Sequence, residues 1–251
     1  MTSTKRLATL VSLVSAPTAA LAIALFPIGV AAEEAAVAPM APDAVDANKV
    51  RVGMYFVHYN ADAPNLSGPF IPPGYDLNLR VQHVNTPYFG FLRRVSPHFT
   101  VELAAGVPPT THTYGKGSAK VGSIPFDGQE VATVKWFSPT LLLEYNFCEE
   151  GSAWRPYIGV GVNYTHFYDR GTTANGVAIV GGPTATFLSD SIGPALTLGL
   201  VYKISRKIDL NASYSIAEVN SQFDAITAGV SRTTEVHFNP GTAVVSVGYS
   251  F

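Results

Sequence analysis

Histidine, serine and cysteine are the side chains of this sequence that could carry acid–base or nucleophilic chemistry. An acyl hydrolase needs a base beside its hydroxyl nucleophile, as in a His-x-Ser pair, and the sequence holds no such pair. His98 with Thr100 comes nearest, next to a short turn, and Cys148 has no second cysteine to pair with. We therefore predict no enzyme, no cofactor and no metal site, because the six histidines lack clustered metal-ligand spacing: His58, His83, His98, His112, His166 and His237.

Composition points away from a water-soluble domain and from nucleic acid. Charged residues make up 14% of the chain, against about 25% in average soluble proteins. Hydrophobic residues make up 47%, and there are 14 Phe, 12 Tyr and 22 Gly. The formal net charge of -2 provides no basic patch for a nucleic-acid backbone.

The first 49 residues predict export rather than fold. Lys5 and Arg6 precede an apolar run that ends at the small residues Val30, Ala31 and Ala32, which is typical of a secretory signal peptide over residues 1–32. Residues 33–49 are rich in Ala and Pro without periodicity, and we interpret them as a flexible periplasmic lead-in.

From residue 50 onward, apolar residues alternate with small polar ones at the two-residue period of a strand. In one run Ile158, Val160 and Val162 alternate with glycine and asparagine. Several runs exceed the usual ~5–6 residues and match the ~9–11 that cross a bilayer obliquely. We expect eight strands, near residues 50–59, 83–93, 99–107, 138–147, 155–169, 191–204, 208–217 and 239–251.

The predicted connections alternate in length. Short turns are expected at residues 94–97, 148–153 and 205–207, and long loops at residues 60–77, 108–130, 169–189 and 220–234. This alternation is typical of outer-membrane barrels, and hydrocarbon requires the sheet to close. We predict an all-β, eight-stranded antiparallel transmembrane β-barrel over residues 50–251, with extracellular loops and both termini periplasmic.

The two faces of the strands predict what each side meets. Turning the apolar face inward would aim Glu102, Glu144 and Asp209 at lipid, which is costly. The inner face is then rich in glycine, which suggests a narrow lumen without the interlocked charge network of structural barrels. We expect the lumen to be contacted by Trp136, Leu142, Tyr157 and Phe167.

Three prolines predict breaks in the barrel wall, because proline removes a donor from the strand ladder. Pro139 and Pro240 fall in the outer half of their strands. Near Pro240 the apolar positions change from even, as in Phe238, to odd, as in Ala243, which suggests a bulge. Our hypothesis is that Pro139 and Pro240, together with Pro108, create a lateral exit.

Several runs resemble the OmpW family of small outer-membrane barrels, which includes AlkL-type alkane importers. The most specific is Arg-Pro-Tyr-x-Gly-x-Gly-x-Asn-Tyr-Thr-x-Phe-x-Asp over residues 155–169; others lie at residues 101–108, 138–147, 188–204 and 240–251. The resemblance covers residues 50–251. It implies a barrel that passes small hydrophobic molecules across the lipopolysaccharide layer and releases them sideways. Ser215 stands where a tryptophan that narrows the lumen is expected.

The expected function is passive uptake of small hydrophobic molecules in a Gram-negative outer membrane. The expected partners are outer-membrane lipid, lipopolysaccharide, small hydrophobic ligands and, as the resemblance implies, the barrel-assembly machinery through Tyr249 and Phe251. A structural or adhesive barrel without transport is the alternative. The apolar, uncharged loop at residues 171–187 favours the conduit.

Overall fold

A computed structural model describes residues 47–61, 78–121 and 123–251. The predicted signal peptide, nearly all of the lead-in and most of the first long loop lie outside these ranges.

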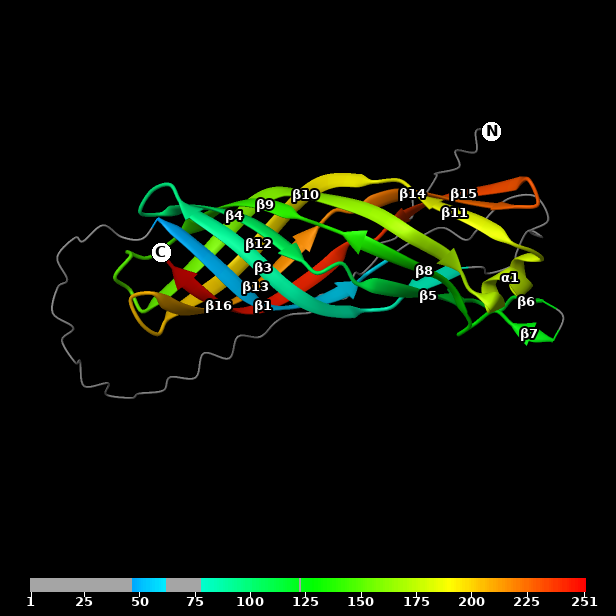
Figure 1. Ribbon diagram of the computed structural model, residues 1–251, viewed down its shortest axis with the longest axis horizontal. Coiled ribbons are helices and arrows are strands. Elements are labelled where there is room, and N and C mark those ends of the chain that lie inside the picture. Colours follow the sequence, from blue (N-terminus) through cyan, green and yellow to red (C-terminus); the bar gives the residue numbers. More distant parts are fainter. Residues whose placement is uncertain (1–46, 62–77, 122) are drawn as a thin grey trace, which may run out of the picture. The chain divides into compact units, whose positions relative to one another are not determined.

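Eight antiparallel strands form a closed ring (Figure 1). The ring closes because β10 pairs with both β9 and β12, while β16 pairs with both β1 and β13. The predicted eight-stranded barrel is therefore confirmed. In ring order from β1, its strands are β1 (Asn48–Tyr59), β3 (Val84–Arg94), β4 (Phe99–Gly106), β9 (Thr140–Asn146), β10 (Trp154–Thr172), β12 (Ser191–Lys203), β13 (Ile208–Ala217) and β16 (Pro240–Ser250).

The described parts of the three later long connections are not irregular loops, as the sequence predicted, but extend the barrel. They hold β5 (Thr110–Lys116), β6 (Lys120–Val121), β7 (Ile124–Pro125), β8 (Glu130–Phe137), β11 (Thr184–Leu188), β14 (Asn220–Thr227) and β15 (Val230–His237), and β2 (Asn78–Val81) joins them. The prediction failed because Gly, Ser, Thr and Asn favour loops locally. In the structure, these segments pair with one another as antiparallel strands and extend beyond the eight-stranded ring. We call this the loop end, and the opposite end, with its short turns, the tight-turn end.

One helix, α1 (Ala174–Val180), lies at the loop end and was not predicted. The Thr173 side chain accepts a hydrogen bond from the Gly176 N–H, and Gly181 ends the helix in the left-handed conformation at φ 81°. In the described part of the chain, no helix is long and apolar enough to span a membrane.

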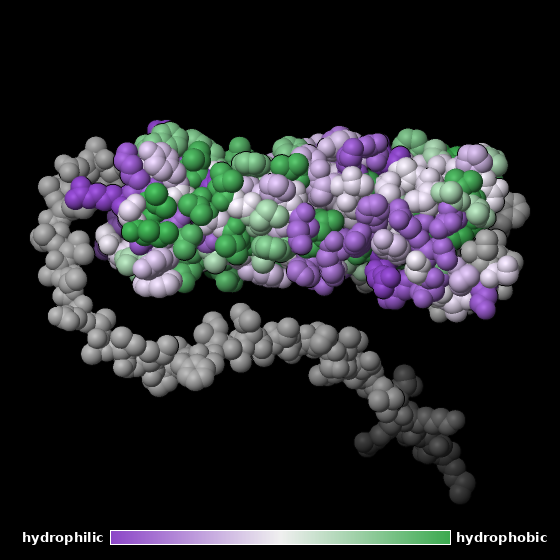
Figure 2. All heavy atoms as spheres, turned by 60° about the horizontal axis from the view of Figure 1, so that its bottom comes forward, coloured by the Kyte–Doolittle hydropathy of each residue, from purple (hydrophilic) through white to green (hydrophobic). Residues whose placement is uncertain are grey.

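The polarity of the wall inverts along the barrel axis. In the tight-turn half the apolar side chains face outward; Leu198, for example, is 62% exposed and Val160 54%. Hydrophobic residues gather on this half in Figure 2, whereas the loop-end half is paler and more polar. At the loop end the apolar residues instead face inward and form a buried cluster: Val134, Phe167, Val219, Val236 and Phe238.

Aromatic side chains ring the tight-turn end, as expected for the girdle of a membrane barrel. The Trp154 and Tyr202 rings lie 4.4 Å apart, and the Tyr145 and Phe147 rings 5.2 Å apart. Phe251 exchanges backbone hydrogen bonds with Asn48, which closes the last strand against the first. The girdle and the closure both agree with the alternation in the sequence.

Candidate functional site

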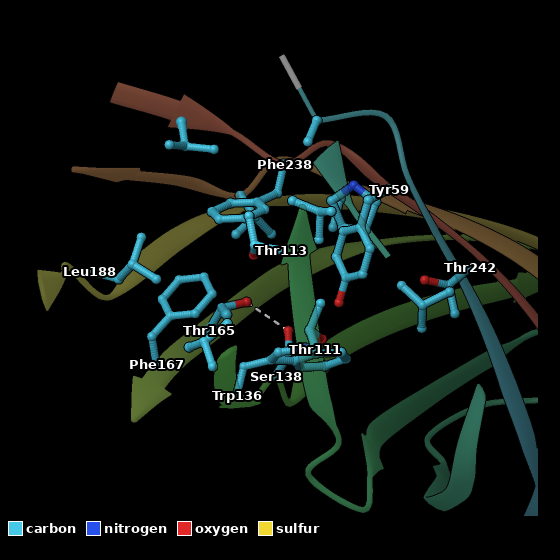
Figure 3. Close-up of a pocket in the computed structure, with 18 of the residues that line it drawn as sticks. Tyr59, Thr111, Thr113, Trp136, Ser138, Thr165, Phe167, Leu188, Phe238 and Thr242 are labelled. Atoms are coloured by element: carbon cyan, nitrogen blue, oxygen red, sulfur yellow. Dashed lines mark hydrogen bonds between the residues drawn. The ribbon is translucent and has the colours of Figure 1, made fainter. Parts of the chain in front are cut away.

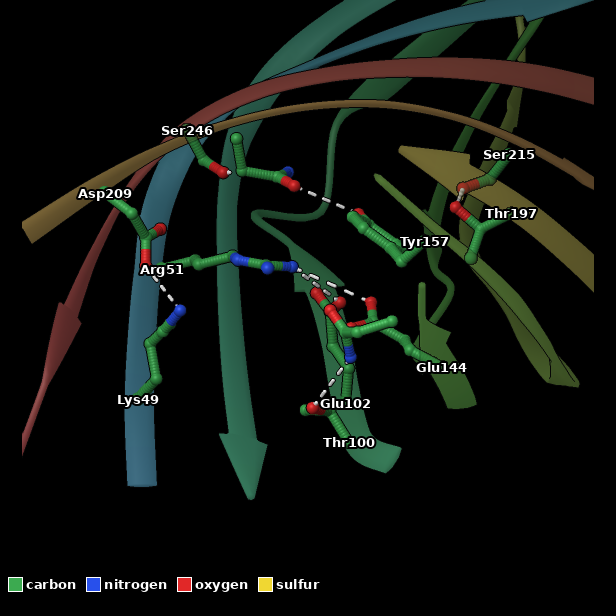
Figure 4. Close-up of polar contacts among 12 residues, drawn as sticks. Lys49, Arg51, Thr100, Glu102, Glu144, Tyr157, Thr197, Asp209, Ser215 and Ser246 are labelled. Atoms are coloured by element: carbon green, nitrogen blue, oxygen red, sulfur yellow. Dashed lines mark hydrogen bonds and ion pairs between the residues drawn. The ribbon is translucent and has the colours of Figure 1, made fainter. Parts of the chain in front are cut away.

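A buried ion-pair network crosses the lumen at the tight-turn half (Figure 4). The Arg51 guanidinium donates to Glu102 at 3.0 Å and lies 3.7 Å from a Glu144 oxygen. The Tyr88 hydroxyl donates to the other Glu102 oxygen. These three charged side chains are at most 5% exposed, so water is largely excluded from them.

Polar side chains from other strands complete this network. Lys49 pairs with Asp209. The Tyr157 hydroxyl donates to Asn211 at 3.0 Å, and its ring lies 5.6 Å below the Arg51 guanidinium. Because six of the eight barrel strands contribute, the network closes the tight-turn half of the lumen, and we call it the floor. Its members are Lys49, Arg51, Tyr88, Glu102, Glu144, Tyr157, Asp209 and Asn211.

The prediction of a lumen without a charge network is therefore wrong, and the inward glycines explain why. A Cβ on Gly90 would lie 2.2 Å from the Tyr88 hydroxyl, and one on Gly199 would lie 2.4 Å from the Tyr157 ring. The glycines do not leave the lumen empty but give room to large side chains from neighbouring strands. In the sequence, Arg51 at an inward position of β1 was the signal that could have revealed the network.

Filling one of these spaces is expected to destabilise the barrel. Gly90→Ala places a methyl group against Tyr88 and Glu102, and overpacking of this kind costs about 1–3 kcal/mol. The measurement is urea unfolding of the protein refolded in lipid vesicles. Gly151→Ala is the matched control, because no atom lies within 4 Å of the added Cβ. Equal stability of the two variants would contradict the role assigned to Gly90.

A cavity of about 220 Å³ lies above the floor and extends toward the loop end (Figure 3). The four residues predicted to contact the lumen, Trp136, Leu142, Tyr157 and Phe167, all line it. Most of its surface is apolar, because the buried cluster of the loop end forms its upper wall. Val236 and Phe238 were not predicted to line the lumen, although both stand at inward-facing even positions.

The polar side chains of the cavity wall satisfy one another. Ser138 and Thr165 share a hydrogen bond of 2.6 Å, and the Asn163 amide donates to Ser138 at 2.9 Å. The Trp136 indole donates to Thr111 at 2.8 Å. With these groups paired, the cavity presents mainly methyl groups and rings to a guest.

A seam interrupts the wall beside this cavity. The ladder between β4 and β9 ends at the pair Ala104–Thr140, and the ladder between β5 and β8 begins at Thr110–Lys135, one residue out of register. Among the described residues, no backbone hydrogen bond joins residues 105–109 to residues 136–139. Cavity residues flank the seam on the inside, and exposed apolar residues flank it outside: Leu103, Val107, Phe137 and Leu141.

The predicted exit prolines occupy different positions relative to the seam. The N–H and C=O of a strand residue point to the same neighbour. Val107 donates to Pro87 of β3, so Pro108, the next residue, faces the seam. Pro139 accepts from Tyr164 and therefore faces β10. Proline has no backbone N–H to donate. Because only Pro108 of these two prolines faces the seam, the missing donor weakens the seam at Pro108.

Pro240 lines the cavity, but the bulge expected beside it is absent. Ile216 pairs with Gly241 and Asn220 pairs with His237 in one unbroken register, bridged by a 2.9 Å bond from Phe238 N–H to Val219. The apolar residues change from even to odd positions because the apolar surroundings change from the cavity inside the barrel to the membrane outside it. Even positions face inward throughout, first into the apolar cavity and then into the polar floor.

The residues considered for chemistry do not assemble into a reactive group. His98 contacts the Asn146 carbonyl, while the Thr100 hydroxyl accepts from the Asn146 amide. His166 lies 2.8 Å from Asp190 on the outside of the wall. In the described ranges, no three His, Cys, Asp or Glu side chains lie where they could hold a metal ion.

A closed antiparallel barrel with an apolar outer belt and aromatic girdle defines an outer-membrane β-barrel, of the kind found in Gram-negative bacteria. Residues 50–251 match the sequence profile of the OmpW family. The chain belongs to this family.

Its relatives include several outer-membrane proteins. Outer membrane protein W of Vibrio cholerae is 30% identical over 143 residues, which span 57% of this chain and 63% of that protein. An uncharacterized outer-membrane protein of Sinorhizobium fredii is 30% identical over 203 residues, 77% of each chain. A dibenzothiophene metabolism operon protein of Pseudomonas aeruginosa is 31% identical over 120 residues, covering 47% of this chain and 52% of that protein.

Two solved structures share the fold. The crystal structure of OprG from Pseudomonas aeruginosa superposes with a TM-score of 0.72 at 22% identity, covering 82% of this chain and 96% of OprG. The solid-state NMR structure of AlkL in lipid bilayers gives a TM-score of 0.61 at 19% identity, covering 85% of this chain and 95% of AlkL. At these identities the likeness shows the architecture.

Proposed function

We propose that this barrel is a passive conduit for small hydrophobic molecules. The observation that carries the proposal is the apolar cavity, closed below by the floor and bordered by the seam. A relative whose name associates it with dibenzothiophene metabolism supports a hydrophobic cargo. The long loops face the cell exterior and the short turns face the periplasm, so molecules enter at the loop end.

Release is sideways in this proposal, because the floor blocks the axial path. Passage through the floor would require breaking ion pairs that water barely reaches, whereas no backbone hydrogen bond between described residues has to break at the seam. Leu103, Val107 and Phe137 outside the seam offer apolar contact with the acyl chains of the membrane. A hydrophobic guest would therefore leave the cavity for lipid without crossing water.

The cavity also distinguishes this proposal from a structural or adhesive barrel. A charge network inside the lumen suits either function, so the floor does not separate them. A cavity lined by Phe167, Val236 and Phe238 and bordered by a weakened wall has no use in adhesion. Unimpaired hydrocarbon uptake by a deletion strain that has lost surface binding would favour the adhesive function instead.

We propose the same partners as the sequence predicts. Lipid contacts the outer belt, and lipopolysaccharide surrounds the loop end. The barrel-assembly machinery recognises the last strand through Tyr249 and Phe251, which are exposed on the outer face with rings 6.5 Å apart.

Narrowing the cavity tests the proposal. Ser215 lines the cavity and donates to Thr197 at 2.9 Å, so Ser215→Trp places an indole in the proposed path. We expect slower uptake of toluene or octane by cells that depend on this protein, at equal barrel abundance. Tyr214→Trp adds an indole on the outer face of the same strand and is expected to leave uptake unchanged. Equal uptake by both variants would overturn the conduit.

A further inference from the structure

Two arginines belong to the lining of the otherwise apolar cavity. The charged residues of its lining are Glu102, Arg170 and Arg232. Glu102 belongs to the floor, where Arg51 compensates its charge. No ion pair among the described residues involves Arg170 or Arg232. The loop-end half of the cavity therefore carries positive charge without a counterion from the described chain.

Arg232 is the better placed of the two. It follows the inward alternation of β15, on the same face as Val236 and Phe238. One of its terminal nitrogens donates to Thr227 at 3.3 Å, while its Nε is buried and has no hydrogen-bond partner. Arg232 stands four positions before Val236, so its stem lies roughly 13 Å along the strand toward the loop end.

Arg170, the second arginine, is an exposed residue at the edge of the wall. The register between β10 and β8 shifts between Tyr168 and Gly171, where Asp169 adopts a positive φ of 47°. A bulge re-aims the side chains beside it, and Arg170 donates to the Leu188 carbonyl at the cavity edge. The Arg170 guanidinium also lies 5.6 Å from the centroid of the Phe187 ring, and Phe187 is 48% exposed, so this charge faces solvent rather than the cavity.

We propose that the cavity selects amphiphilic carboxylates, small aryl or alkyl acids whose carboxylate binds Arg232 while their apolar body contacts Leu188 and Phe223, which line the same part of the cavity. A guanidinium pairs best with a carboxylate, through two parallel hydrogen bonds. A partly buried and unpaired cation is costly, and an anionic guest removes that cost. This inference rests on the proposed function and names the substrate class of the same cavity.

The test uses the fluorescence of Trp136, which lines the cavity. Trp154 lies exposed at the tight-turn end, so a Trp154→Phe background leaves Trp136 as the reporter. The barrel is placed in phosphatidylcholine nanodiscs at neutral pH. 4-Bromobenzoate and the neutral 4-bromobenzyl alcohol are titrated as quenchers of similar size.

We expect the benzoate to quench at about tenfold lower concentration than the alcohol, since hydrogen bonds to charged groups are the strong ones. Arg232→Gln should remove this preference. Arg80→Gln, which removes a cation outside the cavity lining, should keep it. Equal quenching by both probes, unchanged in Arg232→Gln, would overturn the carboxylate preference and leave the conduit standing. Quenching by neither probe would overturn both.

Discussion

Arg51→Met is expected to lower the free energy of unfolding by about 3–5 kcal/mol, because it leaves two buried carboxylates without their cation. Glu102 and Glu144 both lie within 3.7 Å of the Arg51 guanidinium and are almost inaccessible to water. Methionine keeps much of the side-chain volume, so the loss reports charge rather than a void. Urea unfolding in lipid vesicles measures the difference.

A second variant separates charge from packing. Arg51→Met combined with Glu102→Gln and Glu144→Gln removes the whole charge cluster, and neutralising a buried cluster is often tolerated. We expect it to recover most of the lost stability. Arg206→Met, in the exposed turn between β12 and β13, is the control and should unfold like the unmodified barrel. An Arg51→Met barrel as stable as this control would show that the floor contributes no stability.

Pro108→Val is expected to slow sideways release by strengthening the seam. It restores an N–H that faces residues 136–139, which have no backbone hydrogen bond to a described residue on the seam side, and one backbone hydrogen bond is worth about 1 kcal/mol net. That energy corresponds to roughly a fivefold shift toward the closed wall. We therefore expect uptake of a hydrophobic compound to fall by about that factor. Uptake is measured in cells that carry equal amounts of folded barrel.

The other two prolines provide matched controls for this prediction. Pro139→Val restores a donor toward Tyr164 of β10, away from the seam. Pro240→Val falls where the register between β13 and β16 continues unbroken into β14 and β15. Both should leave uptake near its original rate. A loss in these variants, with none in Pro108→Val, would place the exit elsewhere in the wall.

The cavity shows how far inward alternation can predict a site. Trp136, Leu142, Tyr157 and Phe167 were placed inside the barrel by the two-residue period, and all four line the cavity. Their contact with a ligand stays a prediction. At the loop end the same period predicts a bulge between Phe238 and Ala243, and this prediction is wrong because the register there is unbroken. Alternation tells which residues share a face, but the medium outside decides which face is apolar.

The sequence by itself determined the class of fold, because strand alternation, strand length and turn length are local properties of the chain. The tertiary structure decided three things that depend on pairing between distant strands. These are the floor, which needs Arg51 of β1 opposite Glu102 of β4; the strands of the extended loops; and the seam beside Pro108. A one-residue difference between two ladders leaves no local trace, since each strand alone satisfies the same alternation.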